Sequence, residues 1–149
     1  MISNDLRVGL GVDGCASNDN SNLAECIRNA YLLQCLVAPG RGHAAPDPAS
    51  YLNLATRGGA ALLGREDIGE LSVGKCADLF AIRADRLDMV GALDAPQAIP
   101  AKLGLGGPTA LTMIDGRIVW RDGEFPGLDE SKLAAEARVE LSRVLDSKG

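Results

Sequence analysis

The first residue along this chain that could do chemistry is Asp13, which directly follows a short apolar run at residues 8–12 (VGLGV). The run has no polar alternation, which is typical of a strand buried on both faces. Such a strand places Asp13 at its carboxyl end, where barrel enzymes carry catalytic groups. A carboxylate there can bind a metal and hold the proton of a metal-bound water, because the metal lowers the pKa of that water toward about 7. The alternative is an Asp-Gly turn that only caps the next segment.

The polar stretch after Asp13 offers further side chains for a site. Ser17, Asn18 and Asp19 could orient Asp13 or shape the floor of a substrate pocket. The alternative is that they are loop residues leading into a helix cap at Asn22. The candidate site is therefore Asp13, as catalytic group and metal ligand, with these three residues around it.

The glycines of this segment also fit the G-x-G-x-x-G pattern of dinucleotide-binding folds, at residues 9–14. In that pattern the glycines follow a strand and a helix starts at once. Here they lie inside the apolar run, and Asp13 puts a carboxylate where a pyrophosphate approaches. A nicotinamide or flavin oxidoreductase is thus disfavoured.

Other metal-ligating side chains are few. The chain has one histidine, His43, in a loop rich in glycine and proline. The cysteines show no C-x-x-C pair, and we expect buried free thiols at Cys15, Cys26, Cys35 and Cys76. These residues cannot assemble a zinc site of their own without an unusual arrangement.

Two helices are expected to follow the candidate site. Asn22 with Glu25 three residues later forms a capping-box-like start, and the helix runs to about residue 36 with apolar residues on a wide face. Asp47 then caps a helix over residues 48–63, which begins with Pro48 and stops at Gly64. The glycine pair at residues 58–59 permits very close backbone packing.

From residue 68 the pattern changes to strands. Residues 79–82 are one strand candidate, and residues 109–125 form a hairpin in which Leu111 and Met113 face Ile118 and Trp120 across an Asp-Gly turn. A second Asp-Gly pair at residues 122–123 marks another turn. Asp129 caps a final helix to about residue 145, whose single apolar stripe should pack against something larger.

Composition bounds these expectations. The chain has 149 residues, of which 46% are hydrophobic and 23% charged, with a net charge of -5. It is too short for a complete eight-fold β/α barrel of roughly 200 residues or more. Its apolar runs are too short for a membrane span, and its acidic balance argues against a nucleic-acid partner. The first residues lack the pattern of a secretory signal, so a cytoplasmic location is the expectation.

Four ordered segments resemble the amidohydrolase superfamily, in the branch that contains 8-oxoguanine deaminase, atrazine-pathway hydrolases and cytosine deaminases. They are residues 8–19 (VGLGVDGCASND), 55–64 (ATRGGAALLG), 68–79 (IGELSVGKCADL) and 113–123 (MIDGRIVWRDG). Cys15 departs from the small residue, often Ser, expected at its position. The resemblance covers essentially the whole chain.

The resemblance implies an α/β architecture built from the end of such an enzyme. Residues 1–67 correspond to the last strand and helices of an incomplete (β/α)8 barrel of a metal-dependent hydrolase. Residues 68–127 correspond to part of a small β-sandwich, and residues 128–149 to a C-terminal helix. An open barrel edge would expose unpaired backbone and apolar helix faces, which predicts a tendency to aggregate.

The resemblance also implies a chemistry. Family members bind one divalent metal, zinc or iron, through a His-x-His pair, a further His and the Asp of the last strand. Only that Asp is present here, as Asp13, and His43 matches none of the metal histidines and is expected at the surface. In the family the Asp takes a proton from the metal-bound water, and hydrolytic deamination of a heteroaromatic ring follows.

The function implied is thus part of an amidohydrolase that hydrolyses a non-peptide carbon–nitrogen bond in 8-oxoguanine or a related purine, pyrimidine or triazine. The chain alone is expected to be inactive and to hold no metal, with a missing N-terminal barrel portion as its partner. Self-association is expected from its apolar faces. The alternative is a non-catalytic remnant or binding module.

Overall fold

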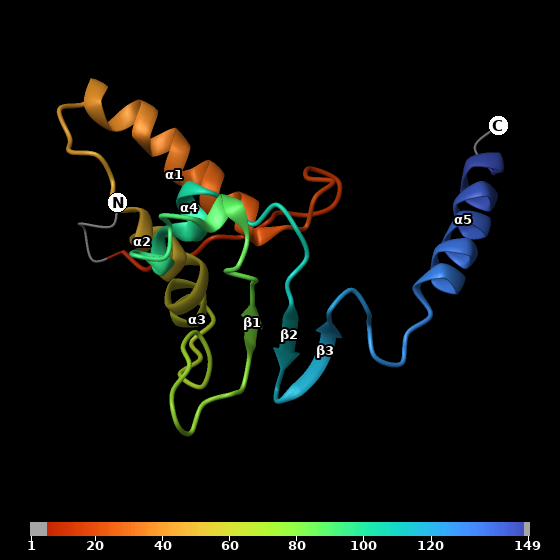
Figure 1. The fold of residues 1–149 in the computed structure, drawn as a ribbon. Coiled ribbons are helices and arrows are strands. Elements are labelled where there is room, and N and C mark those ends of the chain that lie inside the picture. The colour runs from red at the N-terminus through yellow and green to blue at the C-terminus, as the bar shows by residue number, and fades with distance from the viewer. Residues whose placement is uncertain (1–5, 148–149) are drawn as a thin grey trace.

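The computed structural model describes residues 6–147, as mixed helices and strands (Figure 1). The elements in chain order are α1 (Leu23–Gly40), α2 (Pro48–Asn53), the π-helical turn η1 (Leu54–Gly58), α3 (Gly59–Leu62), β1 (Leu79–Ala81), the 3-10 turns η2 (Leu87–Met89) and η3 (Pro96–Ala98), α4 (Ile99–Lys102), β2 (Leu111–Ile114), β3 (Arg117–Arg121) and α5 (Glu130–Asp146). None of the described helices is long and apolar enough to cross a membrane.

The helix α1 begins where the sequence predicts and ends later. Asn22 caps it, because its Oδ1 accepts a hydrogen bond from the N–H of Ala24 at 3.0 Å. The helix continues past residue 36 and includes Pro39 in its last turn. It closes beyond Gly40, where Gly42 adopts a φ of 70° and the N–H of His43 bonds to the carbonyl of Ala38 at 3.0 Å.

The second helix is confirmed as one continuous rod formed by α2, η1 and α3. Asp47 caps it by accepting from the N–H of Ala49 at 3.2 Å, and Pro48 occupies its first turn. Gly64, with a φ of 67°, follows its end. The predicted range of 48–63 is therefore correct to within one residue, although the π-helical turn in its middle was not predicted.

The core lies where α1, α2 and α4 meet. Ile27, Tyr51 and Ala101 are buried there, one from each helix. The rings of Tyr31 and Tyr51 pack edge to face with centroids 5.7 Å apart. Arg28 links α1 to the end of α4, since its Nη1 donates to the carbonyl of Leu103 at 2.6 Å.

The sheet is antiparallel with strand order β1-β2-β3. The predicted hairpin is confirmed: Asp115 and Gly116 have φ angles of 48° and 74°, as a type I′ turn requires. Met113 pairs with Ile118 as expected. Trp120 pairs with Thr112, because a bulge between residues 112 and 113 shifts the register by one.

The predicted strand at residues 8–12 is wrong. This segment runs without secondary structure and is half-buried, with Gly11 exposed. A strand needs a neighbouring strand for its hydrogen bonds, and none of the described strands lies beside this segment. It lies instead on the second helix: a Cβ on Gly58 would overlap the carbonyl oxygen of Val8, and a Cβ on Gly9 would lie 2.7 Å from Leu62. The close packing predicted for the glycine pair is thus confirmed at Gly58.

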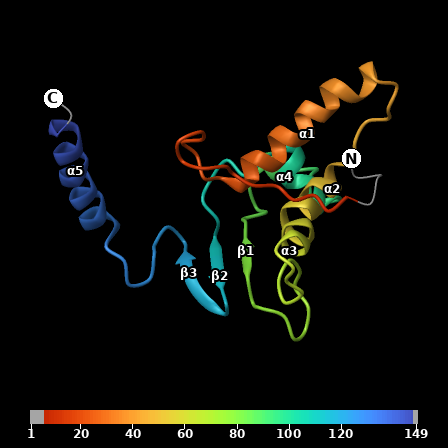
Figure 2. The same cartoon turned by 180° about the vertical axis from the view of Figure 1, so that it is seen from behind.

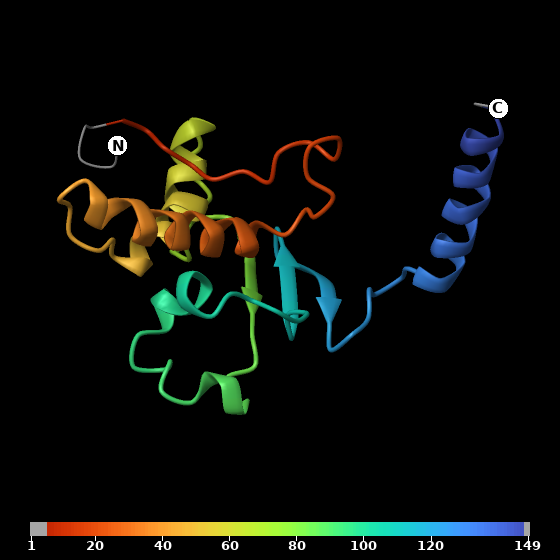
Figure 3. The same cartoon turned by 90° about the horizontal axis from the view of Figure 1, so that it is seen from above.

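The last helix, α5, stands apart from the rest of the molecule in both views from front and back (Figures 1 and 2) and from above (Figure 3). Its predicted cap is confirmed, because Asp129 Oδ1 accepts from the N–H of Lys132 at 2.9 Å. Its apolar stripe is exposed, since Leu133, Leu141 and Leu145 are between 50% and 62% exposed. The packing expected for this stripe is absent from the described part of the chain.

Candidate active site

Asp13 stands at a conformationally unusual point of the backbone. Its φ is 66°, in the left-handed region, where non-glycine residues other than Asn and Asp are rare. Asp115 and Asp122 share this conformation, but both belong to Asp-Gly turns in which the glycine φ is also positive. The glycine after Asp13 has no such φ, so Asp13 is not part of a type I′ turn. A left-handed non-glycine residue costs of order 1–3 kcal/mol and persists only where the surroundings fix it.

The side chain of Asp13 is exposed. Its Oδ1 accepts a hydrogen bond from the N–H of Gly14 at 2.8 Å, and Oδ2 has no donor among the described residues. The N–H of Gly14 therefore holds one carboxylate oxygen, and no described residue donates to the other.

Of the three residues predicted to surround Asp13, the structure brings Asn18 to it. The Nδ2 of Asn18 donates to the carbonyl of Val12 at 2.7 Å. Ser17 contributes its backbone N–H, which bonds to the carbonyl of Gly14 at 2.9 Å. The side chains of Ser17 and Asp19 are exposed and make no hydrogen bond within the described residues.

A ladder of asparagines was not predicted from the sequence. Asn18 Oδ1 accepts from the N–H of Asn20 at 3.1 Å, and Asn20 Oδ1 accepts from the N–H of Asn22 at 3.0 Å. Asn22 then caps α1. Each step is an Asx turn, in which a side chain bonds to the backbone two residues on. The sequence feature that could have indicated this ladder is the spacing of two residues between the three asparagines. Glu25 does not bond back to Asn22 as in a capping box; its Oε2 accepts from Asn20 Nδ2 at 2.7 Å instead.

The remaining candidate ligands do not join Asp13. His43 is exposed, as predicted, and follows the far end of α1, whereas Asp13 precedes the near end. Cys15 is exposed, and the other three cysteines are partly exposed, so the expected burial is not observed. The four thiols are free, as expected. Within residues 6–147, no three His, Cys, Asp or Glu side chains come close enough to hold a metal. Zinc needs about four ligands, so Asp13 and its described neighbours do not form a zinc site.

A large apolar groove is separate from Asp13. It has a volume of about 690 Å³ and lies between the second helix and the sheet. Its lining is mostly apolar, with Leu52, Leu63, Leu79, Phe80 and Met113 among the side chains. The dinucleotide alternative gains no support from these positions, because Gly9 packs on the second helix and no helix begins at Gly14.

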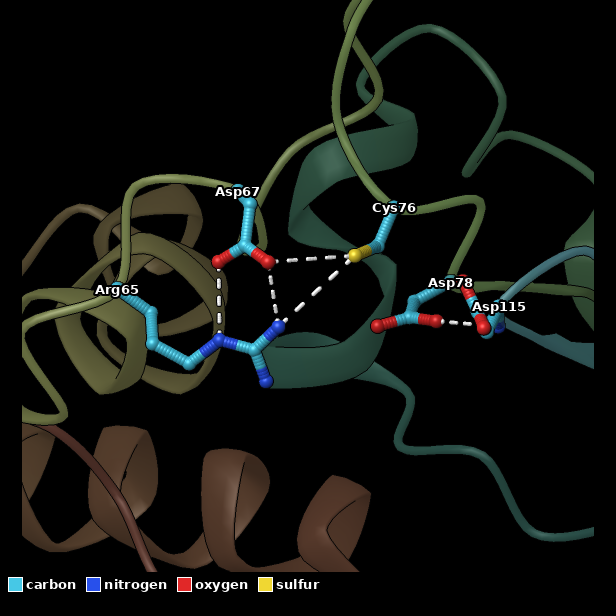
Figure 4. A network of polar contacts seen from close by, with 5 residues as sticks. All are labelled: Arg65, Asp67, Cys76, Asp78 and Asp115. Atoms are coloured by element: carbon cyan, nitrogen blue, oxygen red, sulfur yellow. Dashed lines mark hydrogen bonds and ion pairs between the residues drawn. The ribbon is translucent and has the colours of Figure 1, made fainter.

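A polar network in the loop between α3 and β1 was also not predicted (Figure 4). Arg65 binds Asp67 through two hydrogen bonds, from Nε at 2.9 Å and from Nη2 at 2.5 Å. Cys76 donates from Sγ to Asp67 Oδ2 at 3.4 Å, and its N–H bonds to the carbonyl of Asp67 at 2.8 Å. The Arg65 guanidinium holds the pKa of Asp67 well below its usual value, and the Asp67 carboxylate raises the pKa of the Cys76 thiol. Further along the same loop, Asp78 Oδ1 accepts a hydrogen bond of 2.7 Å from the N–H of Asp115, and this bond connects the loop to the hairpin turn.

A second ion cluster lies nearby. Glu70 accepts from Lys75 Nζ at 2.9 Å and from Arg57 Nη2 at 2.7 Å. These cations, Lys75 first, lower the pKa of Glu70. Arg57 belongs to η1, so the cluster fastens the loop to the second helix.

We compared the chain with known protein families, curated proteins and solved structures. Residues 1–119 match the model of the amidohydrolase family. The chain is 54% identical over 145 residues to the hydroxydechloroatrazine ethylaminohydrolase of Pseudomonas sp. (strain ADP), covering 97% of this chain and 30% of the relative. It is 42% identical over 140 residues to the 8-oxoguanine deaminase of Pseudomonas aeruginosa, covering 93% of this chain and 30% of that protein.

Solved structures agree. The atrazine chlorohydrolase of Arthrobacter aurescens TC1 complexed with zinc matches with a TM-score of 0.83 and 30% identity, over 93% of this chain and 30% of that one. An adenosine deaminase of Xanthomonas campestris with bound zinc matches with a TM-score of 0.81 and 31% identity, over 95% and 32% of the two chains. This chain thus spans about 30% of the length of the relatives it matches.

Proposed function

Since this chain belongs to the amidohydrolase family, we propose that it forms the C-terminal part of a metal-dependent enzyme that hydrolytically deaminates a heteroaromatic ring. The resemblance identified from its motifs is confirmed, and its relatives are deaminases and hydrolases. Since the chain spans about 30% of these relatives, the rest of the barrel is the partner in this proposal.

The observation that carries the proposal is the state of Asp13. Its carboxylate is exposed, no described residue donates to Oδ2, and its backbone adopts the left-handed conformation. In the proposed reaction, Asp13 accepts the proton of the attacking water and returns it to the leaving amine. Its carboxylate would also be one ligand of a divalent metal, zinc or iron, and the rest of the barrel would supply the other ligands.

The proposed substrate is a small heterocycle that carries an amine, such as 8-oxoguanine or a related purine, pyrimidine or triazine. The names of two relatives support this class, an ethylaminohydrolase and an 8-oxoguanine deaminase. Ser17 and Asp19 belong to the proposed substrate loop, because they follow Asp13 closely in the chain and their side chains are exposed.

A hybrid enzyme tests the proposal. This chain replaces the segment that it matches in the ethylaminohydrolase of Pseudomonas sp., and ethylamine release from hydroxydechloroatrazine is measured. We expect turnover from the hybrid, and a fall in kcat of about 100- to 10,000-fold for Asp13→Asn, because general acid/base catalysis typically contributes that much. Asparagine tolerates the left-handed conformation, so the backbone is preserved.

The matched control is Asp115→Asn, since Asp115 is also a left-handed aspartate followed by glycine and lies in the hairpin turn. It should leave kcat unchanged. Full turnover in the Asp13→Asn hybrid removes Asp13 from the mechanism, and a folded hybrid without any turnover contradicts the proposed function.

The second candidate function is a non-catalytic binding module. The exposed apolar stripe of α5 favours it, because such a stripe suits a partner surface.

We expect the purified chain to hold no stoichiometric zinc or iron. Elemental analysis that finds one metal per chain, together with deaminase turnover, would overturn the proposal that the chain needs the rest of a barrel.

A further inference from the structure

Two hydrogen bonds of Asn18 hold the backbone on both sides of Asp13. The side-chain Nδ2 donates to the carbonyl of Val12 at 2.7 Å, and the backbone N–H donates to the carbonyl of Gly14 at 3.0 Å. The carbonyl of Val12 belongs to the peptide group between Val12 and Asp13, and the carbonyl of Gly14 belongs to the residue after Asp13. The φ and ψ of Asp13 therefore lie inside a ring that Asn18 closes.

The orientation of the Asn18 amide is determined by its partners. The carbonyl of Val12 can only accept, and the N–H of Asn20 can only donate. Nδ2 must therefore face Val12 and Oδ1 must face Asn20. Asn18 is half-buried, whereas the residues on either side of it, Ser17 and Asp19, are exposed.

The asparagine ladder connects this ring to the core. From Asn18 the ladder passes through Asn20 to Asn22, whose Oδ1 accepts from the first turn of α1. One turn further along, Ile27 of α1 is buried against Tyr51. An otherwise exposed loop is thus fastened to a helix that the core holds in place.

We propose that Asn18 is the positioning residue of Asp13: it fixes the left-handed backbone at Asp13, and the ladder fixes Asn18 relative to α1. The consequence for catalysis rests on the proposed function, whereas the conformational role does not. Asn18 acts through Asp13 and needs no contact with substrate.

The conformational role is tested on the 149-residue chain by NMR. Asn18→Asp is nearly isosteric and keeps the acceptor for Asn20, but it places an oxygen against the Val12 carbonyl in place of the donor. We expect the strong NOE between the amide and α protons of Asp13, which marks a positive φ, to weaken. Asn18→Leu removes both side-chain hydrogen bonds, the one to Val12 and the one from Asn20, without adding charge, and it should have the same effect.

The matched controls are Asn29→Asp and Asn29→Leu. Asn29 is exposed on α1, and its side chain makes no hydrogen bond among the described residues. These substitutions should leave the Asp13 NOE as it is in the unsubstituted chain. A full-strength NOE in both Asn18 variants would overturn the proposal.

The catalytic consequence is tested in the hybrid enzyme described above. Loss of a residue that orients a catalytic group typically costs about 10- to 100-fold in activity, so we expect that fall in kcat for Asn18→Asp and Asn18→Leu, with a smaller change in KM. In the Asp13→Asn background the Asn18 variants should cause no further loss, because both residues act as one unit. A merely structural role would lower the residual activity in that background too.

The outcomes separate the two proposals. A weakened NOE with unchanged kcat would overturn the catalytic role of Asn18. An unsubstituted hybrid that is folded but inactive would contradict the proposed function, and the NMR result would still decide whether Asn18 fixes Asp13.

Discussion

At the scale of single residues, the structure predicts how the Cys76 thiol reacts. Asp67 accepts its hydrogen bond and raises its pKa, so less reactive thiolate is present. We expect Asp67→Asn to speed the alkylation of Cys76 by iodoacetamide at pH 8, followed by mass spectrometry of each cysteine. Cys15, which is exposed and not part of this network, should react at the same rate in both chains. An unchanged Cys76 rate would show that Asp67 does not control the thiol.

At the scale of elements, the contact between residues 8–9 and the second helix predicts opposite effects at two adjacent glycines. A Cβ on Gly58 would overlap the carbonyl oxygen of Val8, whereas a Cβ on Gly59 meets nothing within 4 Å. Both positions are helical, so Gly59→Ala should raise the free energy of unfolding by about 0.5–1 kcal/mol. Gly58→Ala should lower it relative to Gly59→Ala by about 1–3 kcal/mol, because overpacking costs that much. Urea unfolding of the two variants measures this difference. Equal stability of the two variants would contradict this packing.

At the scale of the whole molecule, two ion clusters predict loss of stability in acid. The pKa of Asp67 is lowered chiefly by the hydrogen bond from Arg65, and that of Glu70 chiefly by the one from Lys75. The unfolded chain has ordinary values of about 3.9 and 4.3, so it binds protons first as the pH falls. These groups therefore stabilise the fold above those values, and the contribution is lost as the pH falls through the lower folded values. We expect the urea midpoint to fall between about pH 6 and pH 3, and to depend less on pH in Asp67→Asn/Glu70→Gln.

The control for this experiment is Asp94→Asn/Glu66→Gln, which removes the same charges from side chains that form no ion pair among the described residues. It should keep the pH dependence of the unsubstituted chain. The same dependence in all three chains would show that the clusters contribute nothing to acid stability.

The sequence by itself determined the local elements and the family. Caps at Asn22, Asp47 and Asp129 and the turn at Asp115 were predicted correctly, because these signals act within a few residues of the chain. Only the tertiary structure decided the features that depend on contacts between distant residues or on contacts that leave no pattern in the sequence. The segment at residues 8–12 reads as a strand, yet strands are defined by neighbours, and here its neighbour is the glycine face of a helix. The role of Asn18 was similarly hidden, since a residue type cannot show which carbonyl its amide meets. Asp13 was identified from its place in a motif. Its left-handed backbone was not predicted, because it occurs within the hydrogen bonds that Asn18 makes to the residues on either side of Asp13.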